Sequence, residues 1–208
     1  MADLQRSWKR AWQGLGAGDD GASVSAALLA AYDEPQRSYH TLQHLHECID
    51  RFETCTDLTV RPAEIEIALW FHDAVYDVFR ADNERRSAEW ARDATVASGV
   101  PAEVAERIAA LVLATKHSTA MPASVDEQLL VDIDLAILGA NRKRFAEYER
   151  QIRREYAHVP EPVFQAKRRA LLAGFMARER LYGTPRLHDE LEERARANLS
   201  LAIAGNVA

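Results

Sequence analysis

The stretch Trp70-Phe71-His72-Asp73-Ala74-Val75-Tyr76-Asp77 places an adjacent histidine and aspartate inside an apolar segment. From Ile65 onward, the apolar residues and His72 follow the i, i+3, i+4, i+7 spacing of the buried face of a helix. Asp73 follows Leu69 by one turn and leans toward the same face. A carboxylate in a core is strongly disfavoured unless it pairs with a cation or binds a metal. We therefore expect this mid-helix pair to meet partners from elsewhere in the chain.

The whole chain has the composition and pattern of a helical globular protein. It has 208 residues, of which 48% are hydrophobic and 28% charged, enough to bury a large core. Apolar residues recur with helical spacing, and no segment shows the period-two alternation of a strand. We expect an all-α fold, with a single multi-helix domain over residues 1–208.

Two expected helices bring histidines toward this stretch. A helix that begins near residues 38–40 would carry His40 and His44 one turn apart. Pro62 suits the first turn of the helix that carries His72, because a proline there lacks only an amide that would be unpaired anyway. The sequence therefore predicts that these histidines project from regular helices.

The later part of the chain is also expected to be helical. Residues 124–127, Ser-Val-Asp-Glu, fit a capping box that opens a helix continuing past Asp134 to Leu138. A long helix is predicted to follow residues 160–162 and to end at residues 181–183, before a final helix. The first of these helices places Asp134 on its apolar side.

Charge and cysteine content limit the classes of partner and compartment. The formal net charge of −6 argues against nonspecific binding to nucleic-acid polymers or anionic membranes. Cys48 and Cys55 match no zinc or redox spacing and do not make a disulfide framework, which favours a reduced, cytoplasmic location. No apolar run approaches the ~18 residues that span a bilayer. The residues contain no indication of oligomeric state.

Two histidines and two aspartates form a candidate metal site. Imidazole and carboxylate groups together suit a divalent cation, and this donor set does not distinguish manganese, magnesium, iron, cobalt, nickel and zinc. Among the later acidic residues Asp134 is preferred to Asp132, because its neighbours at −4, +3 and +4 are all apolar. Asp132 remains open as an outer partner of the site.

The order of these motifs resembles a known superfamily. A histidine, a His-Asp pair and a later aspartate on a helical chain are similar to the HD-domain metal-dependent phosphohydrolases. The closer resemblance is to a small branch of predicted metal-dependent HD phosphohydrolases. It is carried by Tyr39-His40-Thr41-Leu42-Gln43-His44, Trp70 to Tyr76, Asp82-Asn83-Glu84 and Asp132 to Gly139.

The resemblance implies roles for individual residues. Tyr39-His40 followed by His44 is also similar to a signature of the distantly related cyclic-nucleotide phosphodiesterases. Carried over, His40 would be the general acid that protonates the leaving group. The residues that would bind the metal are His44, His72, Asp73 and Asp134. This chain is much shorter than those enzymes and lacks a counterpart of their purine-gripping elements, so cyclic-nucleotide specificity does not carry over.

Further residues are candidates for the remaining chemical tasks. Lys116, His117 and Arg153 are cations that could stabilise developing negative charge, with Arg153 on the substrate. Asp77 or Glu84 could orient the attacking water, hold a second metal or line the substrate side of the site. Many HD enzymes carry an acidic residue three positions after the His-Asp pair, but here that position is Tyr76, followed by Asp77.

These observations predict a metal-dependent phosphoric ester hydrolase. The expected partner is a small phosphorylated metabolite, with a nucleotide as the first expectation. Two alternatives stay open: a non-catalytic HD module that binds a nucleotide or metal, and a di-iron oxygenase, since some HD folds hold two irons with similar ligands.

Overall fold

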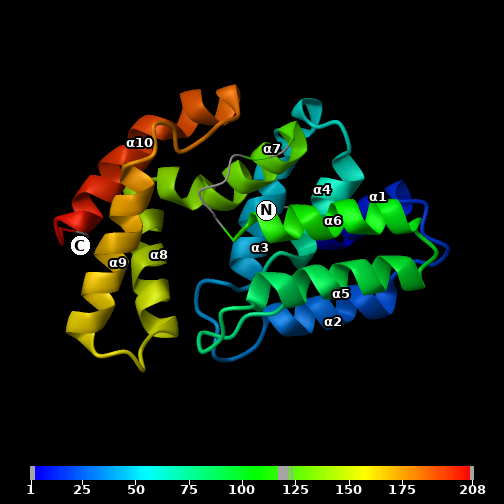
Figure 1. The fold of residues 1–208 in the computed structure, drawn as a ribbon, viewed down its shortest axis with the longest axis horizontal. Coiled ribbons are helices and arrows are strands. Elements are labelled where there is room, and N and C mark those ends of the chain that lie inside the picture. Colours follow the sequence, from blue (N-terminus) through cyan, green and yellow to red (C-terminus); the bar gives the residue numbers. More distant parts are fainter. Residues whose placement is uncertain (1–2, 117–121, 123, 207–208) are drawn as a thin grey trace. The chain divides into compact units, whose positions relative to one another are not determined.

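The computed structural model describes residues 3–116, 122 and 124–206 of the chain. Within these ranges the chain forms ten α-helices and two short 3-10 helices, and none of the described residues lies in a strand. The all-α prediction is therefore confirmed (Figure 1). No helix among the described residues has the length and apolar character needed to cross a membrane.

The chain divides into two compact units, Met1–Ile133 and Asp134–Ala208, and each is described by itself. The expectation of one domain over residues 1–208 stays a prediction. The first unit contains these elements in order: α1 (Leu4–Gly14), α2 (Ala22–Tyr32), α3 (Leu42–Glu53), η1 (Thr56–Leu58), α4 (Pro62–Phe71), α5 (Asn83–Ala97), α6 (Ala102–Ala114) and α7 (Val125–Asp134). The last residue of α7, Asp134, is the first residue of the second unit.

Helix α4 forms the centre of the first unit. Every residue from Glu64 to Phe71 is buried, and the helix packs against α1, α3, α5 and α6. Such all-round burial explains why α4 has no single apolar stripe, and its two buried glutamates, Glu64 and Glu66, are paired with Arg107 and Arg10. Trp8 stacks on Trp12 with ring centroids 4.7 Å apart and meets Trp70 edge-on at 5.1 Å. These rings anchor α1 to α4 next to the His-Asp stretch.

The His-Asp pair lies at the end of α4 and not in the middle of a helix, so this part of the prediction is wrong. The last helical residue is Phe71, and the amide of Ala74 closes a tight turn on the carbonyl of Phe71 at 2.9 Å. Beyond it, the amide of Val75 donates to the hydroxyl of Ser87 at 3.0 Å. Backbone groups that a continuing helix would pair locally are thus paired by distant side chains, which sequence periodicity does not report.

Helix α3 begins later than predicted. It starts at Leu42, with Thr41 as the N-terminal cap, whose hydroxyl accepts from the amide of Gln43 at 3.3 Å. His40 therefore lies in the turn before the helix, while His44 lies in its first turns. The expectation that both histidines project from one helix face is wrong. Thr41 caps the helix, so the helix starts only after His40.

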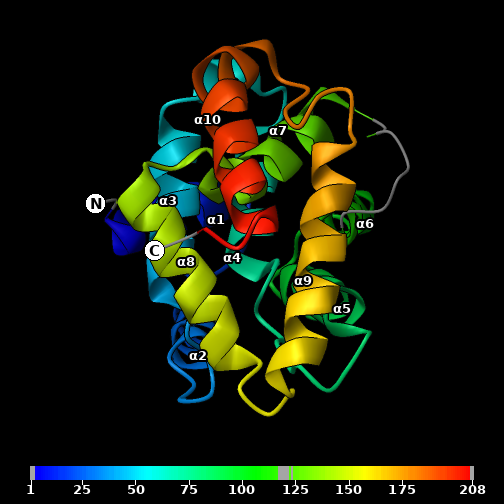
Figure 2. The ribbon, with the colours of Figure 1, turned by 90° about the vertical axis from the view of Figure 1, so that its left-hand side faces the viewer.

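The second unit contains η2 (Leu135–Gly139), α8 (Arg142–Glu155), α9 (Glu161–Met176) and α10 (Pro185–Ile203). Within this unit α9 packs on α10, and η2 lies against α8 and α10. Figure 2 shows α8, α9 and α10. The predicted helix through Leu138 instead becomes a 3-10 helix after Asp134. Ser124 does cap the start of α7, since its hydroxyl accepts from the amide of Glu127 at 3.1 Å.

Helix α9 ends at Met176, earlier than the predicted residues 181–183. The carboxylate of Glu192 on α10 accepts from the amides of Leu181 and Tyr182, at 3.0 and 3.2 Å. These contacts satisfy backbone donors that a longer helix would have paired. The turn between α9 and α10 is therefore held by a side chain from the following helix.

Candidate metal centre

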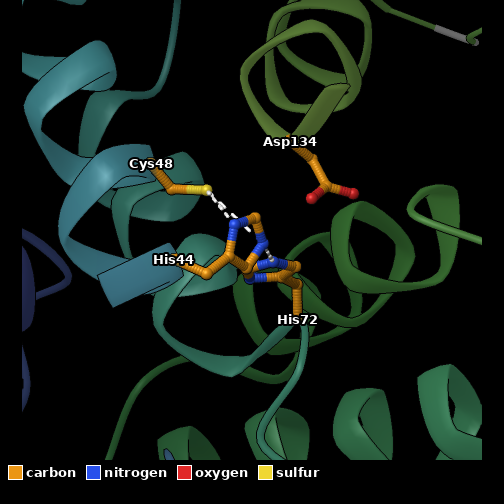
Figure 3. A group of neighbouring side chains, drawn as sticks. All are labelled: His44, Cys48, His72 and Asp134. Carbon is orange, nitrogen blue, oxygen red and sulfur yellow. Dashed lines mark hydrogen bonds between the residues drawn. The ribbon is translucent and has the colours of Figure 1, made fainter. Parts of the chain in front are cut away.

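Two buried histidines from different elements meet in the first unit. His44 comes from the start of α3 and His72 from the turn directly after α4, and they are 2% and 1% exposed. Their Nε2 atoms are 3.0 Å apart (Figure 3). At this distance one ring nitrogen can donate a hydrogen bond to the other, or both can bind one cation.

The tautomer of His72 follows from its backbone partner. Its Nδ1 lies 2.8 Å from the carbonyl oxygen of Leu69. A carbonyl only accepts, so Nδ1 must carry the proton and donate it. When the ring is neutral, Nε2 carries the lone pair; when the ring is protonated, Nε2 can donate to the Asp73 carboxylate, 3.0 Å away. Proteins commonly hold metal-binding histidines in this way, with one ring nitrogen tied to a carbonyl and the other on the metal.

Asp73 adds negative charge to the histidine pair. Its Oδ2 lies 3.0 Å from Nε2 of His72 and 3.4 Å from Nε2 of His44. Burial raises the pKa of Asp73, but the positive charges of His72 and His40, with hydrogen bonds from His44 and His72, outweigh it and hold the pKa well below its usual value. The carboxylate is thus ionised beside the two nitrogens.

The spacing of these three atoms fits a single divalent ion. Ligand atoms about 2.1 Å from a metal lie about 3.0 Å apart at octahedral angles and about 3.4 Å apart at tetrahedral angles. The three separations among His44 Nε2, His72 Nε2 and Asp73 Oδ2 are 3.0, 3.0 and 3.4 Å. The residues present therefore fit a metal with nitrogen and oxygen ligands.

Cys48 and Asp134 extend the donor set. One ligand atom from each of His44, Cys48, His72 and Asp134 lies within 4.8 Å of the others (Figure 3). Cys48 is one turn after His44 on α3, and its sulfur is 3.7 Å from Nε2 of His44. The sulfur is 3.8 Å from the other ring nitrogen, Nδ1. This group can hold a metal ion.

His44 and His72 lie beside Asp73, and both also belong to the group with Cys48 and Asp134 that could hold an ion; metal binding by the four predicted ligands stays a prediction. Cys48 was not among the predicted ligands, although the i, i+4 spacing of histidine and cysteine on one helix could have indicated a shared site. Asp134 belongs to the group, whereas the fully buried Asp132 accepts from the side-chain amide of Gln128 at 2.8 Å.

His40 lies beside the cluster. Its ring stacks on Tyr76 with centroids 3.9 Å apart and an interplanar angle of 24°, and its centroid is 6.0 Å from that of His44. The side chain is half-buried, so it combines contact with the cluster and access to solvent. Its role as a proton donor stays a prediction.

Asp77 and Glu84 are the acidic residues that follow the His-Asp pair; they lie before α5 and in its first turn. The carboxylate of Asp77 accepts from the amide of Phe79 at 2.9 Å, and the backbone of Asp77 is bonded in both directions to the side chain of Asn83. Asp77 thus closes the loop that leads into α5. Glu84 is half-buried in the first turn of α5. Action of either residue on water or substrate stays a prediction.

The predicted cations are distributed differently. Lys116 is exposed in the turn after α6, and His117 lies outside the described residues. Arg153 binds the Glu161 carboxylate and two backbone carbonyls of the turn between α8 and α9, and it covers the ring of Phe164. The structure gives Arg153 a local structural task, and its contact with substrate stays a prediction.

Comparisons with protein-family models, with characterised proteins and with solved structures find no match to this chain.

Proposed function

We propose that this protein is a metal-dependent phosphohydrolase that cleaves a phosphoester of a small phosphorylated metabolite, with nucleotides as the first class to test. The observation that carries the proposal is the convergence of His44, His72 and Asp73 at separations that suit one divalent ion. The resemblance of the motifs to HD phosphohydrolases supports the same reading.

The residues around the cluster suit hydrolysis. A bound divalent ion would acidify a water molecule and polarise a phosphoryl oxygen. His44, His72, Asp73 and Asp134 are the proposed ligands, with Cys48 as a further donor. His40, held flat against Tyr76 and half-exposed, is the proposed general acid for the departing oxygen. An imidazole suits this task because its pKa lies close to neutral pH.

The first experiment measures metal content of the purified protein and of Asp73→Ala by elemental analysis. We expect a transition metal in the wild type and a large loss in the variant. The metal found is then used in a screen for inorganic phosphate released from nucleotides and other phosphoesters, in which Asp73→Ala is expected to be inactive.

Three outcomes would contradict the proposal. A wild type that binds no metal after loading with manganese or zinc would remove its basis. Bound metal without phosphate release from any ester would favour a metal-binding module. Oxygen consumption by an iron-loaded protein without phosphate release would favour an oxygenase.

A further inference from the structure

The candidate site depends on two segments outside regular helices. His40 lies in the turn before α3, and Asp73 lies in the turn after α4. Helical hydrogen bonds therefore do not fix either residue, although ligand and proton-donor side chains need a defined position. Some other group has to hold the two turns together.

The guanidinium of Arg37 contacts both turns. One terminal nitrogen donates to the carbonyl of Asp73 at 2.6 Å and to that of His40 at 3.2 Å, and the other donates to the carbonyl of Ala74 at 2.9 Å. Its Nε donates to the carboxylate of Glu34 at 3.0 Å, which balances the charge. The side chain of Arg37 is fully buried.

Aromatic rings complete this arrangement. The guanidinium carbon lies 5.4 Å from the ring centre of Tyr32 and 5.8 Å from that of Tyr76. The hydroxyl of Tyr32 accepts from the amide of Asp73 at 3.4 Å, and Tyr76 carries the stacked ring of His40. Arg37 therefore touches both the backbone of the two turns and the aromatic rings that support them.

We propose that Arg37 is a positioning residue that holds the His40 turn and the Asp73 turn in one arrangement and thereby sets the affinity of the cluster for a divalent ion. The inference rests on the metal centre of the proposed function. A planar guanidinium has five donors in a fixed fork, whereas the ammonium of lysine is one point with three donors. Lysine at position 37 therefore keeps the charge but does not bridge the three carbonyls in the same geometry.

Arg196 supplies a control with the same kinds of hydrogen-bond partner, although its side chain is 33% exposed and that of Arg37 is fully buried. Like Arg37 it donates to three backbone carbonyls, those of Met176, Arg178 and Glu179, and to one carboxylate, that of Glu192. These contacts all lie in the second unit. Replacing either arginine by lysine thus disturbs hydrogen bonds to three backbone carbonyls and one carboxylate. Only the hydrogen bonds of Arg37 lie next to the metal cluster.

The test compares Arg37→Lys with Arg196→Lys by calorimetric titration with manganese. Loss of partners that orient metal ligands typically weakens metal binding about 10- to 100-fold. We expect this loss in Arg37→Lys and unchanged affinity in Arg196→Lys, even where both variants lose thermal stability. Equal affinity in the wild type and in a folded Arg37→Lys would overturn the proposal.

A second measurement needs no metal. In histidine-labelled, metal-free protein, we expect the ring resonances of His40 and His72 to shift in Arg37→Lys and that of His158, in the second unit, to stay in place. If the wild type binds no metal, the proposed function fails, and this spectrum alone decides the role of Arg37. Unchanged His40 and His72 signals would then refute it.

Glu34→Ala covers the case in which Arg37→Lys does not fold. It leaves the buried guanidinium in place and removes only the carboxylate, which is 41% exposed. We expect the same shifts and the same direction of change in manganese affinity, with a smaller factor. Wild-type behaviour of this variant in both measurements would count against the proposal.

Discussion

His40 and His44 are four residues apart in sequence, but they have different environments. His44 is buried with its Nε2 against His72, whereas His40 is half-buried and stacked on Tyr76. A ligand must give up its lone pair to the metal, while a general acid must exchange protons with solvent between turnovers. The two environments match these two tasks.

Replacing His40 by glutamine tests this division. The amide keeps a polar, planar group next to Tyr76 but cannot transfer a proton, so we expect phosphate release to slow by about 10²- to 10⁴-fold. Metal content, measured by elemental analysis, is expected to match the wild type. A loss of metal that parallels the loss of rate would show that His40 acts as a ligand instead.

Cys48 provides a test of the donor set. Sulfur favours zinc and cobalt over magnesium. We therefore expect Cys48→Ser to bind cobalt more weakly and to lose the near-ultraviolet sulfur-to-cobalt absorption band of the wild type. Magnesium affinity should not change. Cys55, which is buried just after the end of α3 and is not part of the group, is the matched control, and the same substitution there should leave the band intact. A wild-type protein without this band would remove Cys48 from the coordination sphere.

At the scale of the element, the N-terminus of α4 is held by a residue from another helix. Asp126, in the first turn of α7, is buried, and its carboxylate accepts from the amides of Val60 and Arg61 at 2.7 and 3.0 Å. It binds the amides of the two residues that precede α4, whose cap residue Arg61 makes no side-chain cap hydrogen bond. One carboxylate thus ties the two helices that carry His72 and Asp134 to each other.

Replacing Asp126 by alanine removes two part-buried hydrogen bonds, those from the amides of Val60 and Arg61. A hydrogen bond typically contributes about 0.5–1.5 kcal/mol, so we expect the free energy of unfolding to fall by about 1–2 kcal/mol. Urea denaturation measures the change. Asp93→Ala removes an exposed carboxylate paired with Arg92 on α5 and should change stability by no more than about 0.5 kcal/mol. Equal effects of the two substitutions would show that the Asp126 contacts contribute nothing specific.

At the scale of the whole molecule, metal binding should be coupled to the stability of the first unit. A ligand that binds only the folded state at 100 times its dissociation constant adds about 2.7 kcal/mol to the free energy of unfolding. All four tryptophans lie in the first unit, so their fluorescence reports its unfolding.

We therefore expect saturating manganese to raise the midpoint of the fluorescence transition of the wild type, and a chelator to reverse the shift. Asp73→Asn should show little shift, because the neutral amide is a weaker ligand than the carboxylate. A similar shift in both proteins would place the manganese at a different site.

The sequence by itself was enough to determine that the chain is helical, and it pointed to the residues that form the cluster. Helical periodicity and caps are local, so the all-α class, Pro62 at the start of α4 and Ser124 at the start of α7 could be read from neighbouring residues. The order of His44, the His72-Asp73 pair and Asp134 resembles that of the HD phosphohydrolases, which is why these residues could be proposed as ligands before their positions were known.

Only the tertiary structure decided where the helices stop and how the cluster is held. The end of α4 at Phe71 and of α9 at Met176 depends on backbone groups that bond to Arg37, Ser87 and Glu192, which lie far away in sequence. The place of Cys48 in the donor set likewise required the meeting of α3 with the turn after α4. Such contacts carry no local signal, because each partner looks like an ordinary polar or apolar residue until the fold brings the two together.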